Sequence, residues 1–221
     1  MRIHPAGYSV ILKTLGILLI INAIVYIVPH NLLVVSLFVV ASCLVLLFVL
    51  RFFRYPNRKM PALTDNDILC PADGTIVAIE EIEPSSFVNE RQIQVSIFMS
   101  CWNVHINWMP TSGKIKQVLH FDGEFTRAIT PKSSDLNEHT AVAITQADGS
   151  IVLVKQVAGA VARRILTFVK QDEQRTVGEE LGFIRFGSRV DLFLPLNYAV
   201  KVSLGQKVSG RQTIIASKKI N

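Results

Sequence analysis

The 221-residue chain is half hydrophobic and carries a formal net charge of +6. The whole excess lies in residues 1–59, which contain no acidic side chain and these basic ones: Arg2, Lys13, Arg51, Arg54, Arg58 and Lys59. Basic and acidic residues balance in the remainder, so the composition argues against a nucleic-acid partner, which would need a basic face on the folded domain.

Two uncharged segments near the N-terminus predict a transmembrane hairpin. Residues 32–50 would form about 28 Å of helix, close to the thickness of a bilayer core. Residues 14–28, extendable to Tyr8 if Lys13 reaches the interface, form the other span, and Pro29-His30-Asn31 would be the connection. A buried helix pair or a signal peptide are the alternatives. Basic residues flank both outer ends of the hairpin, which predicts a cell-membrane protein with its C-terminal domain in the cytoplasm.

The rest of the chain, residues 60–221, is expected to form a separate domain behind the anchor of residues 1–59. Short segments with period-two alternation predict strands, with a short helical piece at residues 160–166. The predicted strands are residues 76–79, 92–99, 141–144, 151–157, 190–194 and 198–202. The fold class expected is therefore mainly β, with a barrel-sandwich-like β domain behind an N-terminal two-helix transmembrane hairpin.

Two turn-like segments, residues 71–76 and 204–212, resemble those of biotinyl and lipoyl barrel-sandwich domains. The lysine that carries the prosthetic group in such domains is missing. The alternative function is accordingly an uncleaved, membrane-tethered barrel-sandwich adaptor without catalysis. No metal site is expected, because the five histidines show no HxH or HExxH spacing and Cys43, Cys70 and Cys101 no CxxC spacing.

The pair Gly187-Ser188 stands directly before a predicted strand, and its chemistry permits self-cleavage. The Ser188 hydroxyl lies within reach of the Gly187 carbonyl and could attack it to form an ester. Elimination would then release the upstream chain, and hydrolysis of the remaining dehydroalanine would leave an N-terminal pyruvoyl group. Gly-Ser is also a common turn pair, so the dipeptide by itself favours a turn.

The wider segment from Glu179 to Pro195 resembles the processing site of the short, archaeal-type phosphatidylserine decarboxylases. The resemblance runs from about residue 51 to the C-terminus and includes four more motifs: Phe53-Arg54-Tyr55-Pro56-Asn57-Arg58, Pro71-Ala72-Asp73-Gly74, Asn103-Val104-His105-Ile106-Asn107 and residues 156–165. It implies a pyruvoyl cofactor derived from Ser188. It also implies decarboxylation of phosphatidylserine to phosphatidylethanolamine through a Schiff base to that group.

The resemblance further implies a zymogen cut between Gly187 and Ser188 into a large and a small chain. The two products would stay together as a heterodimer, with further oligomerisation open, and would act on a lipid of the bilayer. A polar loop at residues 122–135 is either an ordinary solvated loop or one that dips toward lipid.

Three more residues are candidates for catalysis by resemblance. His105 matches the family's Val-His motif and would donate or accept a proton. Asp73 matches an aspartate that assists processing, most simply by orienting the histidine that deprotonates Ser188, although Asp-Gly alone favours a β-turn. Some longer relatives carry a further histidine where this chain has Trp108. If self-cleavage needs an imidazole, it must come from His105 or His139, and the sequence leaves that choice open.

Overall fold

The computed structural model describes residues 2–28, 31–84, 90–123, 137–159, 164–185 and 188–219. The chain divides into two compact units, residues 1–56 and 57–221. Gly187, residues 160–163 and most of the polar loop at residues 122–135 lie outside the described residues.

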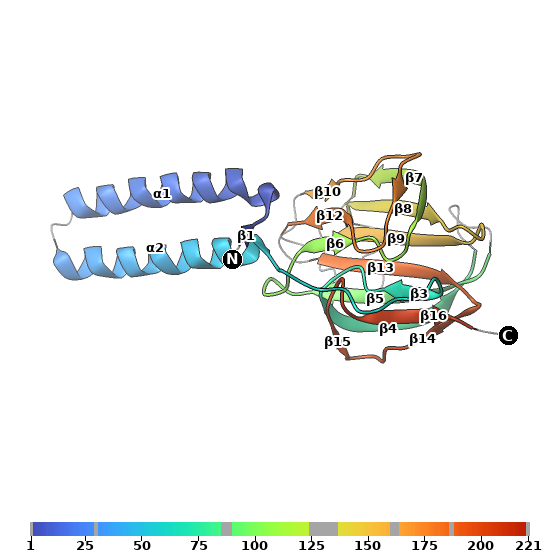
Figure 1. Ribbon diagram of the computed structural model, residues 1–221. Helices are drawn as coiled ribbons and strands as arrows, with labels where there is room; N and C mark the ends of the chain where they lie inside the picture. Colours follow the sequence, from blue (N-terminus) through green and yellow to red (C-terminus); the bar gives the residue numbers. More distant parts are fainter. Residues whose placement is uncertain are drawn as a thin grey trace. The chain divides into compact units, whose positions relative to one another are not determined.

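The first unit contains two helices, α1 (Tyr8–Ile27) and α2 (Leu32–Phe52), that are long and apolar enough to cross a membrane (Figure 1). Asn31 caps α2, because its side-chain oxygen accepts from the Leu33 amide at 3.0 Å. The Asn22 side chain donates to Ser42 Oγ at 2.7 Å and so links the helices within their apolar stretches. A short ribbon of β1 (Arg2–Ile3) and β2 (Arg54–Tyr55) joins the two ends of the hairpin.

The second unit is built on an eight-stranded sheet (Figure 1). Each strand of this sheet is antiparallel to its neighbours. In spatial order the strands are β11 (Gln174–Arg175), β7 (Gly113–Phe121), β8 (His139–Thr145), β9 (Ile151–Ala158), β13 (Ser188–Pro195), β5 (Gln92–Met99), β4 (Gly74–Ile82) and β15 (Lys207–Val208).

Two smaller sheets complete the unit. One contains β10 (Ile165–Thr167), β12 (Glu180–Ile184) and β6 (Ile106–Trp108). The other contains β14 (Tyr198–Val200), β16 (Ile214–Lys218) and β3 (Asp67–Leu69). The mainly β fold class behind two apolar helices is therefore confirmed.

Alternation along the strands divides the large sheet into two buried faces. Val190, Leu192 and Leu194 of β13 point into the main hydrophobic core. On the opposite face, Phe193 packs with Leu153 and two alanines of β8, Ala141 and Ala143. Whether a residue has an even or an odd place in its strand (its parity) therefore decides which of the two cores its side chain joins.

Most predicted strands are present, and β5 has the predicted bounds, residues 92–99. The helix predicted at residues 160–166 is wrong in its described part, because Ile165–Thr167 forms strand β10 and pairs with β12. Cross-strand pairing here overrides the local helical pattern. The two turn-like segments of the sequence do lie together, since Lys207 of β15 pairs with Thr75 of β4.

Asp67 in β3 should make stability sensitive to acid. Its carboxylate accepts hydrogen bonds from the Ser217 hydroxyl and from Thr64, which lower its pKa from 3.8 to about 2. The stabilisation is present above the unfolded pKa and is lost as the pH falls toward 2. Asp67→Asn should therefore lower the free energy of unfolding by about 2 kcal/mol at pH 7. Between pH 4 and pH 2 the variant should lose less stability than wild type. Unfolding of the full chain in micelles, followed by tryptophan fluorescence, measures both; an unchanged pH profile would contradict the assignment.

Candidate active site

Ser188 is the first residue of β13, which lies in the middle of the large sheet. It pairs with Met99 of β5 on one side and with Ala158 of β9 on the other. Its side chain is fully buried, and Oγ donates to the Met99 sulfur at 3.3 Å. The serine next to the predicted scissile bond is thus held in the main core.

The sheet register brings two other candidate residues to the same end. Asp73 immediately precedes β4, whose Thr75 pairs with Phe98, the neighbour of Met99. His139 begins β8 and pairs with Val157, the neighbour of Ala158. Three residues far apart in the sequence therefore gather where β4, β8 and β13 begin.

His139 nevertheless lies on the opposite face of the sheet from Ser188. Its partner Val157 pairs in turn with Arg189, one residue after Ser188, and successive side chains in a strand point to opposite faces. The His139 ring stacks on Phe121 with 4.7 Å between centroids, and Nδ1 is 2.7 Å from the Asn137 carbonyl oxygen. The backbone of the sheet therefore separates this imidazole from the Ser188 hydroxyl.

His105 directly precedes β6 and is completely buried. Its carbonyl oxygen accepts from the Ile184 amide at 3.2 Å, which ties it to the strand that leads toward Ser188. Its Nδ1 is 3.1 Å from the Asn103 carbonyl oxygen, and a carbonyl can only accept, so Nδ1 carries the hydrogen. In the neutral ring the lone pair is then on Nε2, which can take up a proton.

The segment that contains His105 also reaches the contact made by Ser188. Asn107, two residues further, donates from Nδ2 to the Met99 sulfur at 3.7 Å, the same sulfur that accepts from Ser188. Residues two apart in an extended segment project to the same side. His105 lies two residues before Asn107, directly before β6.

Asp73 is held by an arginine that sequence reasoning assigned to the membrane flank. Arg58 binds both carboxylate oxygens, at 2.5 and 2.7 Å, and both side chains are largely buried. The carboxylate also accepts from the amides of Gly210 at 2.9 Å and Val104 at 3.4 Å. Within the described part of the chain, no histidine contacts this carboxylate. Sequence reasoning expected it to orient a histidine ring; its actual link is to the backbone beside His105.

Trp108 supports the same arginine. The Arg58 guanidinium lies over the Trp108 ring, 5.3 Å from its centroid, and also donates to the Gly210 carbonyl oxygen at 2.8 Å. A Cβ at position 210 would be 2.4 Å from the Trp108 ring, so glycine is needed for this packing. Trp108 therefore forms a platform for the Arg58–Asp73 pair.

Replacement of Arg58 by methionine should destabilise the β unit by about 3 kcal/mol, because it leaves a buried carboxylate without its cation. The double variant with Asp73→Asn should regain part of that loss, since the charge is then removed as well. Arg91→Met is the control, because its pair with Glu81 is exposed and should contribute less than about 1 kcal/mol. Denaturant unfolding of the full chain measures all three, and equal effects of the two arginine variants would contradict the buried pairing.

Cys70 lies close to Asp73 but is unsuited to nucleophilic attack. Burial raises the pKa of its thiol to about 12, and its sulfur donates to the Ala72 carbonyl oxygen at 3.1 Å. A thiol becomes a strong nucleophile as thiolate, which such a pKa excludes near neutral pH. Across the described ranges there is also no cluster of three or more His, Cys, Asp or Glu side chains that could hold a metal ion.

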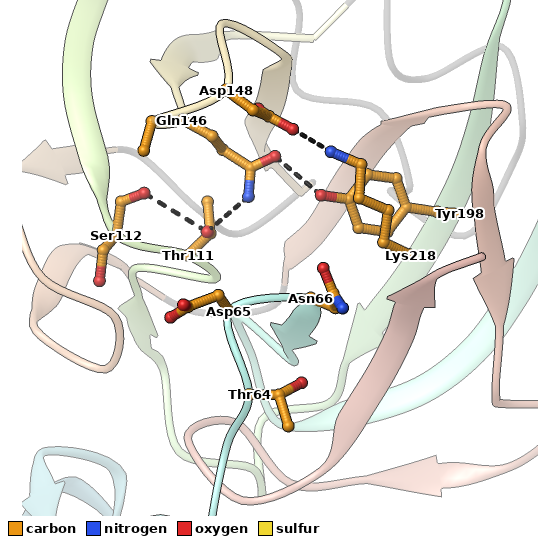
Figure 2. A pocket seen from close by; sticks show the side chains of 10 residues that line it. Thr64, Asp65, Asn66, Thr111, Ser112, Gln146, Asp148, Tyr198 and Lys218 are labelled. Atoms are coloured by element: carbon orange, nitrogen blue, oxygen red, sulfur yellow. Dashed lines mark hydrogen bonds and ion pairs between the residues drawn. The ribbon is translucent and has the colours of Figure 1, made fainter. Parts of the chain in front are cut away.

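A polar cavity of about 290 Å³ lies at the other end of the large sheet (Figure 2). Its central residue, Gln146, donates to Thr111 Oγ1 and accepts from the Tyr198 hydroxyl, both at 2.8 Å. Asp148 is paired with Lys218 at the rim. The length of β13, about 23 Å, separates this cavity from Ser188. Its polar groups form hydrogen bonds and an ion pair with one another. None of the candidate residues lines the cavity, so it is not part of the candidate site.

Comparison with known proteins shows the family of the chain. The model of the phosphatidylserine decarboxylase family matches residues 45–216. A phosphatidylserine decarboxylase proenzyme of Parabacteroides distasonis is 46% identical over 217 residues, 98% of each chain. The proenzyme of Bacteroides thetaiotaomicron is 43% identical over 218 residues, 99% of this chain and 96% of its own. That of Cytophaga hutchinsonii is 42% identical over 217 residues, 98% of each chain. The chain therefore belongs to the phosphatidylserine decarboxylase family.

Proposed function

We propose that this phosphatidylserine decarboxylase generates its pyruvoyl group by breaking its own peptide bond between Gly187 and Ser188. Ser188 Oγ attacks the Gly187 carbonyl carbon, and the peptide nitrogen leaves to give an ester. Elimination across the Cα–Cβ bond of residue 188 expels the upstream chain as a carboxylate. Water then replaces the nitrogen, ammonia leaves, and residue 188 remains as the pyruvoyl group. The observation that carries this proposal is the burial of the Ser188 hydroxyl at the start of the central strand.

His105 is the base that we assign to this cleavage. Its Nδ1–H is directed to a backbone carbonyl, so the lone pair that would take the hydroxyl proton is on Nε2. His139 is disfavoured because the sheet lies between its ring and Ser188. The same Nε2 is the group in this chain that we expect to hold and return a proton during turnover.

Asp73 and Arg58 act as positioning residues in this account. The carboxylate accepts from the Val104 amide, and Val104 is joined directly to His105. Arg58 keeps that carboxylate ionised and fixed, and its own position is set by Trp108. The pair thereby fixes the backbone from which the imidazole projects.

The surroundings of residue 188 suit a pyruvoyl group. Its strand is paired on both sides, so the residue keeps its place after the bond is cut. Its small side chain would face the thioether of Met99, an apolar neighbour. When present, the pyruvoyl carbonyl supplies the electron acceptor that decarboxylation of an amino acid needs and that no ordinary side chain offers.

The two products should remain one folded heterodimer. Residues 188–221 provide β13, which lies between β9 and β5, and also β15 and β16, which pair with β4 and β3. A product that contributes a central strand and three further strands, β14 to β16, has too much buried surface to dissociate readily. Further association of heterodimers is an open part of this proposal.

We propose that the enzyme resides in the cell membrane with its β unit in the cytoplasm. The basic residues at the outer ends of both spans support that orientation. We propose the short, archaeal-type form from the resemblance of the segment Glu179 to Pro195 to the processing site of that form.

The proposed activity is tested by adding phosphatidylserine vesicles to membranes that contain the full chain and measuring release of carbon dioxide and phosphatidylethanolamine. Borohydride together with substrate should trap an adduct on the chain of residues 188–221 and stop the reaction. Substrate turnover without such an adduct would contradict the pyruvoyl assignment. An uncut chain without turnover would instead favour the adaptor function.

A further inference from the structure

A line of buried polar side chains ends at the contact between Ser188 and Met99. It begins at Thr167, whose hydroxyl donates to Gln156 Oε1 at 3.2 Å. Gln156 Nε2 donates to Asn107 Oδ1 at 2.7 Å, and Asn107 Nδ2 donates to the Met99 sulfur at 3.7 Å. Gln156, Asn107 and Met99 are all completely buried.

The strand register makes room for this line. Gly182 of β12 pairs with Asn107 of β6, and a Cβ at position 182 would lie 2.6 Å from Gln156 Nε2. Any larger residue there would push Gln156 away from Asn107. A buried amide pair is stabilising only when its groups are satisfied. In this pair one N–H of Asn107 is directed to a thioether, which is a weak acceptor.

We propose that Asn107 and Gln156 are positioning residues for self-cleavage, and that they act through Met99 on the Ser188 hydroxyl. This inference rests on the cleavage at Ser188 proposed above. Gln156 fixes the rotation of the Asn107 amide, and the Asn107 N–H fixes the sulfur that accepts the Ser188 hydrogen. With the hydrogen directed to sulfur, the lone pairs of Oγ are available for attack on the preceding carbonyl.

The sulfur is suited to this task because it holds the hydroxyl weakly and cannot remove its proton. A carboxylate in its place would bind the hydrogen about twice as strongly as a neutral acceptor does and would compete with the attack. A thioether has no basicity near neutral pH, so the proton must still pass to His105. Met99 therefore orients the nucleophile, and the base activates it.

The test follows the conversion of newly translated full chain into its two products, in membranes, by gel and intact mass. Met99→Leu keeps the volume of the side chain and removes the acceptor, and Met109→Leu is the matched control in the same core. We expect Met99→Leu to cleave about ten-fold more slowly than wild type or Met109→Leu, because misplacement of a nucleophile is costly. The pH dependence of the rate should keep its midpoint, since the base is unchanged.

The amide pair is tested separately by Gln156→Leu and by the exchange Asn107→Gln with Gln156→Asn. The single variant should slow cleavage about ten-fold, whereas the exchange keeps the summed length of the two side chains and should restore the rate to within about three-fold of wild type. Equal cleavage rates for Met99→Leu and Met109→Leu, or an exchange no faster than Gln156→Leu, would overturn this inference. Failure of wild type to cleave at Ser188 would instead overturn the proposed function itself.

Discussion

Ser188→Ala should leave the chain at full length and reduce decarboxylation to background, a loss of at least about 10⁴-fold. Alanine has no hydroxyl to attack the Gly187 carbonyl, so neither the ester nor the pyruvoyl group can form. The chain would also lack any other electron acceptor for the reaction. The fold should survive, because alanine fits the small buried position at the start of β13.

The matched control is Ser96→Ala, which removes an equally buried hydroxyl from strand β5. Ser96 pairs with Asp191, whose parity in β13 is opposite to that of Ser188, so its side chain lies on the other face of the sheet. This control should cleave and decarboxylate at the wild-type rate. Gel analysis and release of carbon dioxide in the same membranes distinguish the two variants. Turnover by an uncut Ser188→Ala chain would contradict the proposed function.

His105→Gln should slow self-cleavage about 100-fold or more, whereas His139→Gln should remain within about three-fold of wild type. Glutamine can keep a hydrogen bond to a nearby carbonyl but cannot take up a proton. Both histidines start a strand or directly precede one, and both are buried, so a general loss of stability would affect them alike. The difference between the variants therefore reports the side of the sheet from which the proton is removed.

Unfolding of each variant, followed by tryptophan fluorescence, separates a fold defect from a loss of the base. If the His139 variant showed the larger loss of rate at unchanged stability, the assignment of His105 as the base would be wrong.

The sequence pattern predicted five strands of the large sheet, β4, β5, β8, β9 and β13, because each buries at least one apolar face. It missed β7, whose register shifts between Ile115 and Gln117, and the two-residue strands β11 and β15. The hairpin followed from the absence of charge over two long segments. The piece at residues 160–166 was mispredicted because Ile165–Thr167 is a strand only through its pairing with β12. Such a short segment carries too little periodicity to distinguish helix from strand.

The geometry around Ser188 depends on the register of the paired strands, which could not be read from the sequence pattern alone. His139 and His105 are equivalent in sequence as candidate bases, and only the pairing through Val157 and Arg189 separates their faces. Arg58 was counted among the basic residues that flank the membrane, although its partner Asp73 is buried in the β unit. The only sequence signal for it was its place in the Phe53–Arg58 motif. The contact between Arg58 and Asp73 is made by the three-dimensional fold, and no local sequence pattern indicates it.

The most direct test of self-cleavage is the intact mass of the wild-type protein isolated from membranes. The account predicts two chains, one that ends at Gly187 and one that comprises residues 188–221. The second should be lighter by one ammonia than the same chain with an N-terminal serine, and it should resist stepwise degradation from its N-terminus. A single chain of residues 1–221 in membranes that decarboxylate phosphatidylserine would contradict the account.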